Sequence, residues 1–110
     1  MPKRTLSNGE KVAAEIRGRF ELDAHEEALL VEVVRTVDQL DVLAGIVADE
    51  GSMVDGRFGP RAHPALVEAR QLRITLARLV AALRLPDEDV GARPQRRGTR
   101  GVYGIRGSVG

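Results

Sequence analysis

The chain of 110 residues contains no cysteine and no tryptophan, and only three of its residues are aromatic. Without cysteine it can form neither a disulfide framework nor a thiolate metal site. It has no apolar run near the roughly 20 residues of a membrane-spanning helix, and its first residues lack the apolar block of a signal peptide. We therefore expect one small cytoplasmic domain that makes no contact with a membrane.

The chain is rich in aliphatic residues at helical spacing, and these occur in two long segments, residues 23–51 and 63–86. Steps of three and four place each series along one side of an α-helix. The first series is Leu29, Val33, Thr36, Leu40, Leu43 and Val47, and the second is Ala69, Leu72, Leu76, Leu79 and Leu83. A connection of about a dozen residues lets the helices run antiparallel and bury these stripes. The expected fold is an all-α hairpin of two long helices.

Capping signals mark where the helices begin. Ser7 and Glu10 have the spacing of a capping box, which predicts a short helix over residues 10–19. Asp23 and Glu26 repeat that spacing before the long helix, and Glu27 also lies in the first turn, where the helix dipole favours negative charge. These carboxylates are therefore explained by capping rather than by acid–base catalysis.

The link between the long helices contains Asp55-Gly56, the favoured pair for a two-residue type I′ turn. Two residues on each side would complete a very small β-hairpin. A hairpin of this size is marginal in water, so we expect Val54 and Phe58 to pack on the helix ends.

Catalytic patterns are missing from the sequence. It has no nucleophile with a neighbouring base, no nucleotide-binding loop and no metal-ligand cluster, and His25 has no ligand partner at metal spacing. We therefore expect a protein that is not an enzyme and that has no cofactor.

The long first helix is apolar on more than one side, which a single partner helix cannot cover. Its second face consists of Leu30, Val31, Val34 and Val37. Because the chain has no other long helix, we expect this face to be an interface between copies of the protein in a homo-oligomer.

The net charge of +1 is unevenly distributed. Five Lys/Arg and two Glu give +3 in residues 1–20, seven Arg and eleven acids give −4 in 21–86, and five Arg and three acids give +2 in 87–110. Basic extensions typically meet polyanions. The residues expected to contact DNA are Lys3, Arg4, Lys11, Arg17 and Arg19. Alternatively, this arm, residues 1–22, is an amphipathic segment docked on the helical core.

The Gly/Arg-rich tail, residues 87–110, is expected to contact DNA or a protein partner, or else only to aid solubility. Its candidate residues are Arg93, Arg96, Arg97, Arg100, Tyr103 and Arg106. The arginines of the second long helix are interpreted as solvated side chains or as salt-bridge partners of the acidic first helix in a neighbouring copy.

Three segments together resemble the small terminase subunits of tailed bacteriophages and prophages, especially the short actinobacterial kind. They are DAHEEALLVEVVRTVDQLDVL, VDGRFGPRAHPALVEARQLRITLARLVAALRLPDED and RPQRRGTRGVYGIRG, in the same order and spacing. The resemblance implies a ring-forming homo-oligomer in the host cell cytoplasm. It also implies recognition of double-stranded viral DNA and its delivery to the large terminase subunit, an ATPase and nuclease. Residues 1–22 are not expected to form the N-terminal helix-turn-helix domain that many members carry.

The resemblance and the surplus apolar surface favour the same interpretation, a non-enzymatic small terminase with residues 23–86 as its oligomerisation core. Such proteins generally place DNA recognition towards the N-terminus, which assigns DNA to the arm and the large subunit to the tail. Two alternatives remain open: a small helical DNA-binding regulator that forms dimers, and a helical adaptor that does not bind DNA.

Overall fold

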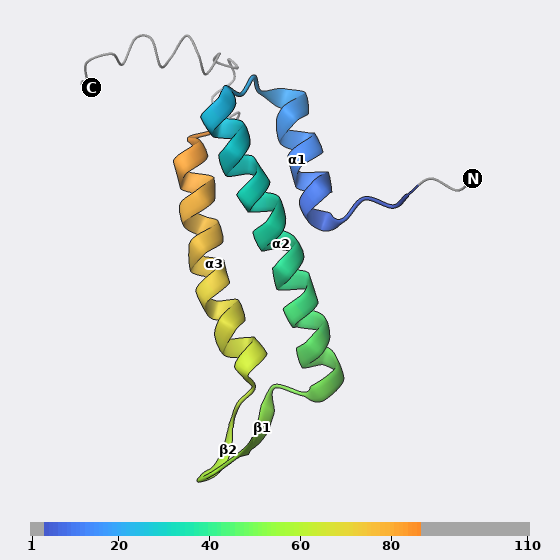
Figure 1. Ribbon diagram of the computed structural model, residues 1–110, viewed down its shortest axis with the longest axis vertical. Helices are drawn as coiled ribbons and strands as arrows, with labels where there is room; N and C mark the ends of the chain where they lie inside the picture. Colours follow the sequence, from blue (N-terminus) through green and yellow to red (C-terminus); the bar gives the residue numbers. More distant parts are fainter. Residues whose placement is uncertain (1–3, 87–110) are drawn as a thin grey trace, which may run out of the picture.

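The computed structural model describes residues 4–86, which form three α-helices and one two-stranded sheet (Figure 1). The elements are α1 (Asn8–Arg19), α2 (Ala24–Glu50), β1 (Met53–Gly56), β2 (Gly59–Ala62) and α3 (Pro64–Leu83). α2 lies in the middle, α3 runs back along one side of it, and α1 packs beside its N-terminal half. The mostly helical fold is therefore confirmed. None of the helices in this part of the chain has the length and apolar character needed to cross a membrane.

Both predicted capping boxes are present. At α1, the Ser7 hydroxyl accepts from the Glu10 backbone N–H at 3.1 Å, and the Glu10 carboxylate accepts from the Ser7 N–H at 2.8 Å. At α2, Asp23 and Glu26 exchange the equivalent hydrogen bonds at 3.2 and 3.0 Å. Each box satisfies backbone N–H groups that a helix start leaves free, so short sequence signals located both helix starts to within two residues.

The core consists of two clusters along α2. Near its N-terminal end, Ala13 of α1, Leu30 and Val33 of α2 and Leu83 of α3 are buried together. Further along, only α2 and α3 meet, around the smaller cluster Leu43, Ala65 and Ala69. The polar member of the first stripe, Thr36, is buried too, and its hydroxyl donates to the Glu32 carbonyl at 2.7 Å. The predicted stripes therefore do face the core.

The second apolar face of α2 is covered within the chain, contrary to our expectation. Leu30 is 0% exposed, and Val34 and Val37 are partly buried against the same cluster. Only Val31 remains exposed, at 38%. The cover comes from α1 together with Leu83 of α3, which agrees with the interpretation of the arm as an amphipathic segment docked on the helical core.

α1 is held on α2 by polar contacts at its N-terminus. The Asp38 carboxylate accepts from the Gly9 backbone N–H and from the Ser7 hydroxyl, both at 2.8 Å. The Asn8 amide donates to Asp41 at the same distance. An acidic residue of α2 thus lies at the positive end of the α1 dipole, which is a favourable arrangement.

The β-hairpin has a different register from the predicted one. Met53 pairs with Ala62 and Gly56 pairs with Gly59, so the turn residues are Arg57 and Phe58 rather than the expected Asp55-Gly56. Neither turn residue has a positive φ, which excludes a type I′ turn. Gly59 supplies the positive φ instead, at +119°, and the shifted turn lets four residues of each strand pair.

The prediction that Phe58 packs on a helix end is also wrong, because Phe58 is 94% exposed. Val54 is only partly buried. The outward position of Phe58 follows from the register, which puts it at the tip of the turn.

The N-cap of α3 is His63, which is 8% exposed and whose side chain has two partners. Its Nδ1 accepts from the Ala65 N–H at 2.9 Å, which makes it the N-cap, and its Nε2 lies 2.7 Å from the Glu50 carboxylate. His63 therefore joins the end of α2 to the start of α3. At the other end, Arg84 takes a left-handed conformation (φ 55°), so α3 ends before the predicted stop at Pro86.

Candidate nucleic-acid interface

The arginines of the N-terminal arm are held by carboxylates. Arg17 pairs with Glu27 at 2.9 Å, and Arg19 pairs with Glu15 at 2.8 Å. Lys11 is exposed and makes no ion pair with any described residue, whereas Lys3 lies outside the described residues. Most of the arm cations predicted to bind DNA therefore already have an anionic partner.

Arg4 is the arm cation with the most specific partner. Its guanidinium donates two hydrogen bonds of 3.1 Å to the carboxylate of Glu10. These bonds lower the pKa of Glu10 and raise the pKa of Arg4, because each stabilises the charged form. These bonds engage two of the five N–H donors of Arg4, and the Glu10 carboxylate would repel a phosphate that approaches the others. The formal charge of +3 already includes Glu10 and Glu15, so the additional neutralisation comes from Glu27, which lowers the local charge to +2.

Exposed arginines without a carboxylate partner lie instead on the β-hairpin and on α3. The set, which we call the α3 arginine surface, consists of Arg57, Arg61, Arg70, Arg73 and Arg78. Within residues 4–86 none of them forms an ion pair. The sequence showed these residues, but it could not show that the acidic α2 of the same chain leaves them unpaired.

Acidic and basic residues are segregated along the described part of the sequence. Residues 20–52 contain nine acids and one arginine, which gives −8, and residues 53–86 contain six arginines and two acids, which gives +4. Arg70 and Arg78 are eight residues apart, or about 12 Å along a helix at 1.5 Å per residue. That length matches three to four base pairs of duplex DNA at about 3.4 Å each. The α3 arginine surface is therefore suited to follow a phosphate backbone.

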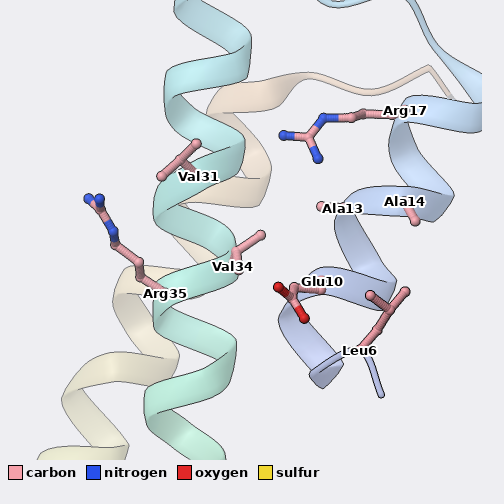
Figure 2. Close-up of a pocket in the computed structure, with 8 residues that line it drawn as sticks. All are labelled: Leu6, Glu10, Ala13, Ala14, Arg17, Val31, Val34 and Arg35. Atoms are coloured by element: carbon pink, nitrogen blue, oxygen red, sulfur yellow. The ribbon is translucent and has the colours of Figure 1, made fainter. Parts of the chain in front are cut away.

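A groove of about 460 Å³ lies between α1 and α2 (Figure 2). Its lining includes the apolar side chains of Val31 and Val34, and Val34 points toward Ala13 of α1. The two arginines that line it already pair with carboxylates, Arg17 with Glu27 and Arg35 with Glu32. The lining residues in this part of the chain include no Ser, Thr, Cys or His, so the groove has no nucleophile.

One cluster at the start of α2 has metal-ligating atoms, which corrects the expectation that His25 lacks such partners. One potential ligand atom from each of Asp23, His25 and Glu26 lies within 4.8 Å of the others. His25 Nδ1 is 2.9 Å from an Asp23 oxygen. Both carboxylates, however, serve the α2 capping box, and this role accounts for their proximity.

The tail residues Arg93, Arg96, Arg97, Arg100, Tyr103 and Arg106 lie outside the described residues.

Comparison of the chain with protein-family models, curated proteins and solved structures finds no match. A functional assignment therefore depends on the residues of this chain and on the sequence segments that resemble small terminases. Of the DNA-binding sites suggested by the sequence, the arm is the one whose arginines the structure shows paired with carboxylates. The α3 arginine surface is the site that sequence reasoning undervalued.

Proposed function

We propose that the chain is the small subunit of a phage terminase, which binds double-stranded viral DNA and delivers it to the large subunit for genome packaging. It assembles into a homo-oligomeric ring and has no catalytic activity of its own. The observation that carries the proposal is the α3 arginine surface, which is exposed and free of intrachain ion pairs. The three-segment sequence resemblance supplies the biological setting.

Unpaired arginines matter because phosphate contacts supply most of the affinity of non-specific DNA binding. A guanidinium binds phosphate oxygens through two parallel hydrogen bonds. Arg70, Arg73 and Arg78 offer three such groups on one helix, and Arg57 and Arg61 extend them onto the β-hairpin. This surface replaces the arm as the principal DNA contact in our proposal. The tail remains the proposed contact for the large subunit.

Self-association in the proposal uses two unlike faces. On α2, Val31 and Val42 are 38% and 55% exposed among acidic residues. On α3, Val67 and Ile74 are 46% and 48% exposed, seven residues apart, among arginines. Head-to-tail contacts between different faces close into rings when the rotation allows, and a ring repeats each weak DNA contact around its circumference.

The test is a salt titration of DNA binding by fluorescence anisotropy, with two variants of equal charge. One variant combines Arg70→Gln, Arg73→Gln and Arg78→Gln. The control combines Arg4→Gln, Arg17→Gln and Arg19→Gln. We expect the α3 variant to bind more weakly and to lose up to about 2.7 units of salt slope per subunit, at about 0.9 per phosphate contact. The arm variant should change less.

Other outcomes would reject parts of the proposal. If the arm variant flattens the slope and the α3 variant does not, DNA binds at the arm, as the sequence suggested. A wild-type protein that binds no duplex DNA would favour the adaptor alternative. A dimer in native mass measurements, together with one strongly preferred duplex site, would favour the regulator. ATP hydrolysis or DNA cleavage by the purified chain would contradict its assignment as a non-enzyme.

A further inference from the structure

The tip of the β-hairpin presents an aromatic side chain to solvent. Phe58 is 94% exposed, the highest value among the exposed large hydrophobic side chains of the described residues. Two-residue hairpin turns favour Asn-Gly or Asp-Gly, so turn formation does not require phenylalanine here. Nor does packing, because so exposed a side chain buries almost no apolar surface. The residue at the tip is therefore explained neither by local folding nor by the core.

The hairpin holds the backbone at this tip in a defined place. Gly56 pairs with Gly59 across the turn, and a Cβ on Gly56 would come within 2.8 Å of the Gly59 carbonyl oxygen. At the base of the hairpin, the His63 N–H donates to the Ser52 carbonyl at 2.9 Å. The His63 side chain also joins the hairpin base to Glu50 at the end of α2. The hairpin thus connects the end of α2 to the start of α3, and its tip projects beyond both helix ends (Figure 1).

The neighbours of Phe58 suit a nucleic acid. The Arg57 guanidinium lies over the Phe58 ring, 5.3 Å from its centroid. Arg61 on β2 is exposed, and Pro60 precedes it on the same strand. Proteins that enter the minor groove of DNA combine arginines with an apolar wedge such as phenylalanine, which is inserted between base pairs. Flanking arginines are not needed for Phe58 to enter a pocket of a protein partner. In a complex with DNA they would bind the phosphates beside the opened base step.

We propose that the β1–β2 hairpin is a DNA wedge, in which Phe58 inserts between base pairs of a duplex and Arg57 and Arg61 bind the adjacent phosphates. This inference rests on the proposed DNA-binding function and adds a mode of contact to it. Insertion partly unstacks a base step and bends the duplex. The α3 arginine surface, which continues from the same hairpin, then contacts the backbone beyond the bend.

The test uses the full chain and a duplex of about 30 base pairs in which several adenines are replaced by 2-aminopurine, whose fluorescence rises on unstacking. Binding of the wild type should raise the fluorescence. Phe58→Ala should abolish the rise and weaken binding about tenfold, within the range for loss of one stacked aromatic residue. Phe58→Leu should keep part of both effects, because leucine also wedges. The matched control is Val12→Ala, which shortens an exposed apolar side chain on α1.

Each remaining outcome overturns the wedge and separates it from the proposed function. If Phe58→Ala binds and unstacks DNA like the wild type, DNA binding stands but the wedge is wrong. If Phe58→Ala keeps its DNA effects and loses oligomer mass or binding to the large subunit, the tip is a protein contact. Failure of the wild type to bind duplex DNA rejects both proposals together. Because Phe58 is exposed, its variants should unfold at the wild-type temperature, which excludes misfolding as the cause.

Discussion

At the scale of the residue, Gly9 is the described glycine with the least room for a side chain. It is buried where α1 meets α2, and a Cβ there would lie 2.4 Å from the Val34 carbonyl oxygen and 2.8 Å from the Asp38 carboxylate. Its own N–H donates to that carboxylate. The obstruction on one side is helix backbone, which cannot move without displacing α2. Glycine is needed here for close approach rather than for a positive φ.

Gly9→Ala should therefore destabilise the protein by about 1–3 kcal/mol, the usual cost of overpacking. The measurement is urea unfolding followed by circular dichroism. Gly18→Ala in the same helix is the matched control, since a Cβ there meets nothing within 4 Å. That control should stabilise by up to about 1 kcal/mol, because alanine favours the helix. Equal effects of the two substitutions would show that the α1–α2 contact is looser than described.

At the scale of the element, α1 is attached by polar contacts at its start and by few apolar ones along its length. Within the described part of the chain, Ala13 is the one residue of α1 in the buried hydrophobic core, and Ile16 is partly buried against the same cluster. The Ser7–Glu10 capping box and the Arg4–Glu10 pair fix the first turn. The stability of this first turn should consequently depend on the ionisation of Glu10.

The pKa of Glu10 is lowered mainly by the hydrogen bonds from Arg4. A carboxyl whose pKa is lower in the folded state stabilises the fold above its unfolded pKa of about 4.3. That contribution disappears as the pH falls through the folded pKa. Glu10→Gln should therefore lower the melting temperature at neutral pH, and the difference from the wild type should shrink below about pH 4. Melting curves from pH 7 to pH 3 measure this.

Glu15→Gln removes a carboxylate from the same helix without affecting the cap, and so controls for net charge. A melting-temperature difference between Glu10→Gln and the wild type that stays constant down to pH 3 would contradict the proposed coupling. Because Glu10 is close to solvent, the effect should be modest and should weaken with added salt.

Sequence reasoning succeeded for elements whose signals are local. The Asp23 and Glu26 cap located α2, and the three-and-four spacing identified the side of α2 that faces α3. It failed where the outcome depends on which distant residues meet. The sequence allowed a docked arm, but nothing near Leu30 shows whether α1 or another copy of the chain covers it, and nothing near Arg17 shows that Glu27 pairs with it. The β-hairpin failed for another reason, because Gly56 and Gly59 each permit a tight turn and strand pairing decides between them.

At the scale of the whole molecule, the burial of Leu30 changes how self-association must be tested. Its substitution by a charged residue would disrupt the core of one chain and would report little about contacts between chains. A useful substitution lies on a face that is apolar and exposed in one copy. Ile74 meets this requirement, because it is 48% exposed on α3.

Ile74→Glu should leave the fold intact, with a stability change near 0.5 kcal/mol, as is usual for surface sites. It should also yield smaller species than the wild type by light scattering or native mass measurement. Leu30→Glu should instead abolish the helical circular dichroism signal, because it buries an uncompensated charge. An unchanged mass for Ile74→Glu would show that this face of α3 is not the contact between copies.

The position of Leu83 has a consequence for synthesis of the protein. Leu83 is the last residue of α3, and it closes the cluster around Leu30 and Val33 with 0% exposure. On the ribosome, α1 and α2 emerge first, but this side of α2 stays open until translation has passed residue 83. Growing chains are thus exposed to aggregation until α3 is almost complete. Once it is complete, folding should be fast, because the packed elements are consecutive in the sequence and their contacts are local.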